Sequence, residues 1–90
     1  MQNEKKVETS LVKHIKAIGG MALKQTAIAG IPDRLLLLPQ GRAVFVELKA
    51  KGQKLRPLQQ YRKEQLEKLG FEVYVIDDTT QISEFCSQFH

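Results

Sequence analysis

The stretch GIPDRLLLLPQGRAVFVELKAKG, residues 30–52, contains two apolar runs with charged residues at their ends. Asp33 comes just before the first run, and Glu47 and Lys49 lie near the end of the second. The connection PQGR between the runs has the length of a hairpin turn, so we expect the runs to pair as adjacent antiparallel strands. In the natural register, this pairing would bring the Asp33 carboxylate close to Glu47.

The remaining apolar residues predict three helices and two further strands. In chain order, these are a helix at 4–18, a strand at 21–26, a helix at 57–69, a strand at 71–76 and a last helix that begins after Asp78 or Thr79 and carries Ile82, Phe85, Cys86 and Phe89. The first helix has apolar residues at every third or fourth position, which is typical of an amphipathic helix. No repeat or linker divides residues 1–90, so we expect one domain. Its order is α-β-β-β-α-β-α, an α/β (α+β) fold in which helices flank a mixed central sheet.

Composition narrows the class of protein. The chain has 90 residues, of which 42% are hydrophobic and 27% are charged, as in ordinary soluble domains. No apolar run approaches the ~20 residues that cross a bilayer, so we expect no membrane partner. The polar N-terminus lacks a signal-peptide core and Cys86 is the single cysteine, which favours a reducing, cytoplasmic location. The net charge of +4 slightly favours a polyanionic partner such as nucleic acid.

Glu47 and Lys49 lie on one face of their predicted strand, because side chains alternate along a strand. They could simply form the polar side of a half-solvated strand. However, the strand is apolar on both faces up to Val46, as in a covered central strand, where an uncompensated carboxylate is costly. Mg²⁺ between Asp33 and Glu47 would compensate it, and the backbone carbonyl of Leu48 could add another oxygen ligand. Lys49 would then direct its ammonium at the attacking water or at the phosphate during phosphodiester hydrolysis.

Four motifs, taken in order, resemble those of the PD-(D/E)XK nucleases and, within them, the VRR-NUC family. They are Glu8 on a helix, the turn Gly30-Ile31-Pro32-Asp33, the strand segment Glu47-Leu48-Lys49, and Gln59 near the start of a helix. The resemblance covers nearly the whole chain. It implies a restriction-endonuclease-like α-β-β-β-α-β core with Mg²⁺ or Mn²⁺ at the acidic cluster. It also implies that Asp33, Glu47 and Lys49 are catalytic, with Glu8 and Gln59 as supporting groups.

Glu8 and Gln59 also have simpler interpretations. Glu8 borders the apolar stripe of its helix, where it could be a boundary glutamate that reaches water. The resemblance favours a metal-site role instead. Gln59 and Gln60 are about 100° apart on their helix, so only one of them can face the cleft. The resemblance favours Gln59, which would orient a phosphate or a water, and Gln60 is the alternative.

Basic residues follow the predicted active strand, and five of them are expected to bind DNA phosphates on either side of the cleaved bond. They are Lys51, Lys54, Arg56, Arg62 and Lys63. A solvated charged loop would explain some of them equally well. His14 and His90 lack metal-ligand spacing and Cys86 has the spacing of a core residue, so we expect none of these three to be catalytic.

Together these features predict a divalent-metal-dependent, structure-specific DNA endonuclease. Stand-alone proteins of the resembled type tend to cut branched DNA such as Holliday junctions as homodimers, so the resemblance implies DNA and a second copy of the chain as partners, in a bacterial or phage-infected cell. The alternative is a non-catalytic nucleic-acid-binding module, in which the acidic pair is a structural remnant. A restriction-type enzyme that reads base edges needs inserted loops, for which 90 residues leave little room.

Overall fold

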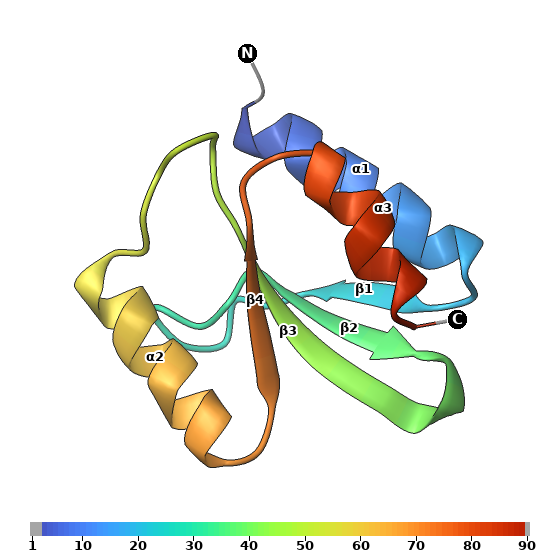
Figure 1. Ribbon diagram of the computed structural model, residues 1–90. Coiled ribbons are helices and arrows are strands. Elements are labelled where there is room, and N and C mark those ends of the chain that lie inside the picture. The colour runs from blue at the N-terminus through green and yellow to red at the C-terminus, as the bar shows by residue number, and fades with distance from the viewer. Residues whose placement is uncertain (1–2, 90) are drawn as a thin grey trace.

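Four strands build one sheet with helices on both of its faces in the computed structural model of the chain, which describes residues 3–89 (Figure 1). The elements are α1 (Glu4–Ala17), β1 (Met21–Lys24), β2 (Arg34–Leu38), the 3-10 turn η1 (Pro39–Gly41), β3 (Arg42–Leu48), α2 (Pro57–Lys68), β4 (Glu72–Ile76) and α3 (Thr80–Ser87). This order confirms the predicted one, with η1 inside the hairpin connection. Within residues 3–89, no helix has the length and apolar character that crossing a membrane requires.

The sheet is mixed, with the strand order β1-β2-β3-β4. The pairs β1–β2 and β2–β3 are antiparallel, and the pair β3–β4 is parallel. A parallel pair needs a crossover connection, and the segment containing α2 provides it. In the β2–β3 register Arg34 lies opposite Val46, so Asp33, one residue before β2, reaches the level of Glu47.

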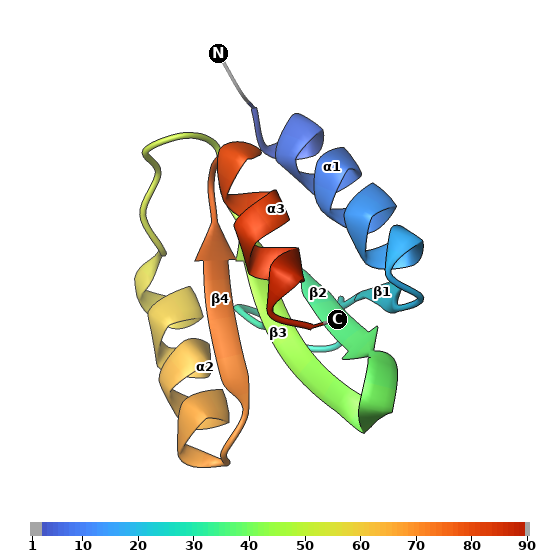
Figure 2. The same ribbon diagram turned by 45° about the vertical axis from the view of Figure 1, so that its right-hand side comes forward.

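The buried core lies on one side of the sheet, where α1 and α3 run next to each other (Figure 2). Its members are Val7, Leu11, Ile15, Leu36, Leu38, Val44, Val46, Leu48, Ile76, Ile82, Phe85, Cys86 and Phe89. The apolar stripe of α1 faces this core, as its spacing predicted. Cys86 is a core residue as expected, and burial raises the pKa of its thiol.

The opposite face of the sheet is only partly covered. α2 packs on β4 and contributes no buried residue of its own. Phe45 of β3 is half-buried and meets the Phe71 ring edge-on at 5.7 Å. Farther out, Met21 and Leu37 lie opposite each other and are 58% and 38% exposed. β3 is therefore covered on both faces only near its end, where Glu47 lies, and not along its whole length as expected.

The ends of the elements differ from the predicted ones by one or two residues. β1 ends at Lys24 rather than Thr26, although Gln25 N still donates a hydrogen bond to the Asp33 carbonyl at 2.8 Å. α3 ends two residues before Phe89, which nevertheless packs into the core. Core packing beyond the last helical turn explains why apolar spacing overestimated the length of α3.

Gly30 allows α2 to lie close to the turn before β2. Its φ of +80° is in the left-handed region, which favours glycine. A Cβ at this position would lie 2.7 Å from Leu58 Cγ and 3.0 Å from the Leu58 carbonyl oxygen. Arg62 Nε also donates to the Ala29 carbonyl at 3.0 Å, so two contacts hold α2 against this turn.

Gly30→Ala is expected to lower the free energy of unfolding by about 2 kcal/mol, because left-handed strain adds to a steric clash. Gly19→Ala is the matched control, since Gly19 has a φ of +88° but nothing within 4 Å of the added Cβ. Its expected loss is about 1 kcal/mol, from strain alone. Urea unfolding of both variants measures the difference, and equal losses would argue against the tight packing of α2 at Gly30.

Candidate active site

Asp33 and Glu47 meet at the end of the β2–β3 hairpin. Asp33 Oδ2 accepts a hydrogen bond from Leu48 N at 3.0 Å, and Glu47 Oε1 accepts one from Asp33 N at 3.2 Å. The antiparallel register explains this exchange, because Asp33 continues β2 toward the residues that end β3. The structure therefore brings together the two carboxylates that the hairpin pattern predicted to be neighbours.

Lys49 lies beside this pair, directly after β3. Its N donates to the Ile76 carbonyl at 3.0 Å, which extends the β3–β4 pairing by one residue. Its Nζ is 3.7 Å from Glu47 Oε2, and the two side chains are 8% and 5% exposed. The ammonium and the carboxylate thus form a nearly buried ion pair on one face of the strand, as alternation along β3 predicted.

Gln59, rather than Gln60, faces the site. Its Nε2 donates to Glu47 Oε2 at 2.8 Å, and its Oε1 accepts from Arg56 N at 2.9 Å at the start of α2. Gln60 points elsewhere and donates to Glu64 at 2.9 Å. Both polar ends of the Gln59 amide are therefore used, so its orientation toward Glu47 is fixed by the first turn of α2.

The Glu47 carboxyl has an unusual pKa. Burial is the main cause that raises this pKa from 4.5 to about 7, and the negative charge of Asp33 raises it further. The positive charge of Lys49 and the Asp33 N–H act in the opposite direction and lower it. One lysine thus does not compensate two carboxylates at this degree of burial. The site has an excess of negative charge that a cation would neutralise.

Glu8, the other predicted metal-site residue, has a different partner. Its Oε2 accepts a hydrogen bond from Arg34 Nη2 at 2.9 Å, and Arg34 also donates to the Ala22 carbonyl at 3.0 Å. Arg34 lies opposite Val46 and shares the core-side face of the sheet, whereas Glu47 lies on the other face. The geometry therefore places Glu8 in an ion pair between α1 and β2, and its role at the metal site stays a prediction.

Glu4 is a residue that the sequence reasoning missed. Its negative charge is the smallest of the causes that raise the pKa of Glu47, and its own side chain is exposed. The signal was present, because Glu4 precedes Val7 by three residues and Leu11 by seven, which puts it on the sheet-facing stripe of the helix. Glu4 is thus a second candidate for an acidic group from α1.

The donor set suits a hard divalent cation. Among residues 3–89, no group of three or more His, Cys, Asp or Glu side chains comes together in a way that could hold a metal. The acidic set at the site is therefore the pair Asp33 and Glu47. Mg²⁺ is commonly bound by one or two carboxylates and completes its octahedron with water and substrate phosphate. The pair, with its excess negative charge, fits that pattern.

Three of the five predicted DNA-binding cations have partners within the protein. Lys63 binds Glu67 at 2.9 Å, Arg62 donates to Ala29 and Gln65, and Lys51 pairs with Asp78. The other two, Lys54 and Arg56, are exposed and make no ion pair within the described part of the chain. DNA contact by all five stays a prediction. Of the two histidines given no role, His14 contacts the Ser10 carbonyl at 2.8 Å, and His90 lies outside the described residues.

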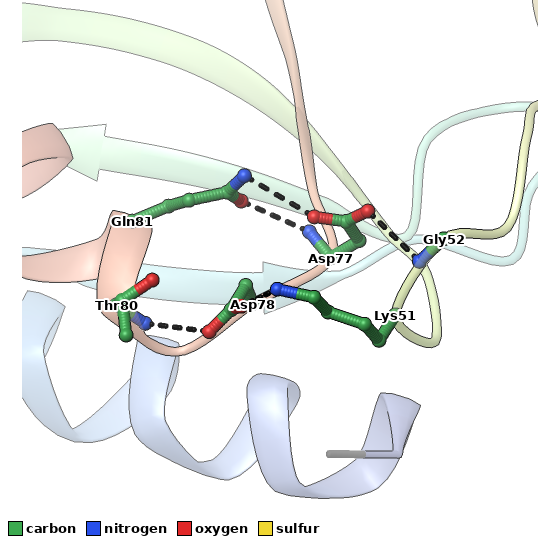
Figure 3. A network of polar contacts seen from close by, with 6 residues as sticks. All are labelled: Lys51, Gly52, Asp77, Asp78, Thr80 and Gln81. Carbon is green, nitrogen blue, oxygen red and sulfur yellow. Dashed lines mark hydrogen bonds and ion pairs between the residues drawn. The ribbon is translucent and has the colours of Figure 1, made fainter. Parts of the chain in front are cut away.

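A polar network fixes the loop that follows Lys49 to the segment between β4 and α3 (Figure 3). Lys51 pairs with Asp78, and Asp78 Oδ1 accepts from Thr80 N at 3.0 Å. Gly52 N donates to Asp77 Oδ2 at 3.1 Å. The hydrogen bond from Lys51 is the main cause that lowers the pKa of Asp78 from 3.8 to about 2. The loop is thereby anchored close behind the active strand.

Three comparisons relate the family and fold of the chain to known proteins. A family model of the VRR-NUC domain matches residues 2–78. A relative from Acyrthosiphon pisum secondary endosymbiont phage 1, named "Putative nuclease p44", is 42% identical over 76 residues, which cover 82% of each chain. A solved structure of a VRR-NUC domain superposes over the full length of both chains with a TM-score of 0.86 and 28% identity. The range that the family model matches contains the positions of Asp33, Glu47 and Lys49.

Proposed function

This chain belongs to the VRR-NUC domain family, a family of nucleases, and we propose that it is a divalent-metal-dependent DNA endonuclease that hydrolyses phosphodiester bonds. One observation supports the proposal most strongly. Asp33 and Glu47 meet at the end of the hairpin, and Lys49 Nζ lies 3.7 Å from Glu47 Oε2. Two acids beside one ammonium are the groups that metal-assisted phosphate hydrolysis requires.

Asp33 and Glu47 would hold Mg²⁺ or Mn²⁺ together with the backbone carbonyl of Leu48. The Leu48 N–H points to Asp33, and the N–H and C=O of one strand residue point to the same side. When bound, the cation supplies Lewis-acid polarisation of the phosphate and neutralises part of its charge. The pKa of Glu47 is raised because nearby positive charge does not fully compensate its buried carboxylate. A bound cation would supply the missing positive charge, which supports this assignment.

The other residues of the site act on charge and position. Lys49 stabilises the negative charge that develops on the attacked phosphate and orients the attacking water. Gln59 holds the Glu47 carboxylate by donating to Oε2. Glu8, which pairs with Arg34, is the acid of α1 that we propose as a supporting group, and the charge of Glu4 makes a small contribution to the raised pKa of Glu47.

Branched DNA, including four-way junctions, is the proposed substrate, and a homodimer is the proposed active form. Two-fold symmetry would present two active sites to two strands. The exposed apolar pair Met21 and Leu37 supports association, because a chain this small gains stability by burying such a surface. Sedimentation equilibrium should give twice the mass of one chain. A fully active wild type with the mass of a single chain would contradict the dimer.

A cleavage assay tests the proposed activity. Linear duplex, flap, fork and four-way-junction DNA are incubated with Mg²⁺, and matched reactions contain EDTA. We expect Mg²⁺-dependent cleavage that is faster on the branched substrates than on linear duplex. Binding without cleavage of any substrate would instead indicate a non-catalytic nucleic-acid-binding module. Cleavage confined to particular base sequences in linear duplex would indicate a restriction-type enzyme.

A further inference from the structure

A basic groove of about 730 Å³ lies along α1, and none of the residues that line it belongs to the active site. We call it the α1 groove, and its lining includes Lys5, Lys6, Thr9, Ser10, Lys13 and Thr79. The lysines lie on the side of the helix opposite its buried stripe. Thr79, at the start of α3, lines the groove on one side, so residues of both α1 and α3 form the groove.

The lysines of the α1 groove have no acidic partner. Lys5, Lys6 and Lys13 form no ion pair with any side chain of residues 3–89. Glu8 is three residues from Lys5, but it binds Arg34 at 2.9 Å on the sheet side of the helix. Lys16 follows Lys13 at a spacing where like charges repel each other on a helix. A bound polyanion would relieve this repulsion.

α2 shows the opposite pattern. Lys63 is neutralised by Glu67, and Arg62 is held by hydrogen bonds to Ala29 and Gln65. A cation that already pairs with a protein group gains less binding free energy from a phosphate than a cation that is surrounded by solvent. On α1, four lysines between positions 5 and 16 make no ion pair within the described residues.

The α1 groove starts close to the active site. Glu8, three residues after Lys5, binds Arg34 at 2.9 Å, and Arg34 follows Asp33 directly in the chain. The first half of α1 is therefore near the start of β2, next to Asp33, and the helix runs on from there to Ala17. A nucleic-acid strand that leaves the cleavage site on this side would meet Lys5 and Lys6 first and Lys13 later.

We propose that the α1 groove binds the sugar–phosphate backbone of a duplex arm that extends from the cleavage site, an inference that rests on the proposed nuclease function. At 1.5 Å per residue, the helix from Lys5 to Lys16 is about 17 Å long. One DNA strand advances about 3.4 Å per phosphate along the duplex axis, so the lysines follow roughly five nucleotides. If the groove binds this arm, the affinity for DNA depends on the length of the arm.

The test compares two double variants that remove equal charge. Lys6→Ala with Lys13→Ala removes two of the three groove lysines, and Lys24→Ala with Lys68→Ala removes two exposed lysines outside the groove. DNA affinity is measured in EDTA by fluorescence anisotropy over a range of salt concentrations. The DNA is a junction with arms of either about 5 or about 20 base pairs, and the shorter arm is too short to cover both the cleavage site and the whole groove.

With long arms, the groove variant should lose about two units of the slope of log affinity against log salt, since each phosphate contact contributes about 0.9. The control variant should keep the wild-type slope, and short arms should reduce the difference between the two. Equal slopes for groove and control variants on long arms would overturn the proposal. Cleavage is measured separately. Normal cleavage together with an unchanged salt slope would reject the groove proposal and leave the nuclease proposal intact. A reduced slope in a protein that cleaves nothing rejects the nuclease and keeps the groove as a nucleic-acid site.

Discussion

Lys49→Ala is expected to lower the rate of Mg²⁺-dependent DNA cleavage by about a hundredfold to ten thousandfold, the range for one positioned catalytic group. The ammonium lies 3.7 Å from Glu47 Oε2, and both side chains are almost inaccessible to solvent, so water replaces its charge poorly. Lys49 also lowers the pKa of Glu47. Its loss favours the protonated carboxyl, so the residual activity should need a higher pH. Cleavage rates at saturating DNA across a pH series measure both effects.

Asp33→Asn should cause a comparable loss, because it removes one of the two carboxylates at the site. Lys68→Ala, which removes an exposed lysine at the end of α2, should cleave at the wild-type rate. Circular dichroism and DNA affinity in EDTA should be close to wild type in all three variants. Full activity in both Lys49→Ala and Asp33→Asn would reject the assignment of the active site.

Glu47→Gln is expected to remove most of the pH dependence of stability between about pH 5 and pH 8 in the absence of divalent ions. The pKa of Glu47 is about 7 in the folded chain, against an ordinary value of 4.5. The folded chain therefore holds this proton more tightly than the unfolded chain. The resulting stabilisation is complete below pH 4.5 and is lost as the pH rises through 7. Since one pKa unit corresponds to about 1.4 kcal/mol, the loss is on the order of 3 kcal/mol.

Urea unfolding at several pH values measures this change. The wild type should lose stability toward pH 8, whereas the glutamine variant, which has no proton to lose, should stay level and become the more stable chain there. Adding Mg²⁺ at pH 8 should stabilise the wild type and leave Glu47→Gln unchanged. A wild-type profile that is level over the same range would show that the buried carboxyl is not held in its protonated form.

The arrangement of Asp33 and Glu47 could be predicted because one short connection sets the register of the hairpin. A slip of one residue would turn every side chain of β3 to the other face, so the apolar pattern allows a single register. The coverage of the sheet could not be predicted in the same way. Apolar residues such as Leu37 show that a surface can be buried, but not that α2 lies over β4 and leaves them open.

The partners of side chains on the helices and loops were harder to predict than those on the strands. Glu8 binds Arg34, and this pairing depends on how α1 lies over β2, which no local pattern encodes. Lys51 is similar, because its partner Asp78 is 27 residues away in the chain. Helix geometry alone could not separate Gln59 from Gln60, and the resemblance to the family favoured Gln59, whose amide donates to Glu47 in the structure.

The most direct measurement of the central claim is a calorimetric titration of Mn²⁺ into the wild type and into Asp33→Asn. We predict one cation site per wild-type chain, with an affinity that falls about tenfold for each pH unit below 7, because binding must displace the Glu47 proton. Asp33→Asn should bind at least about tenfold more weakly, since it has lost a charged ligand. Equal affinities for the two chains, or binding that does not change with pH, would contradict a cation held between Asp33 and Glu47.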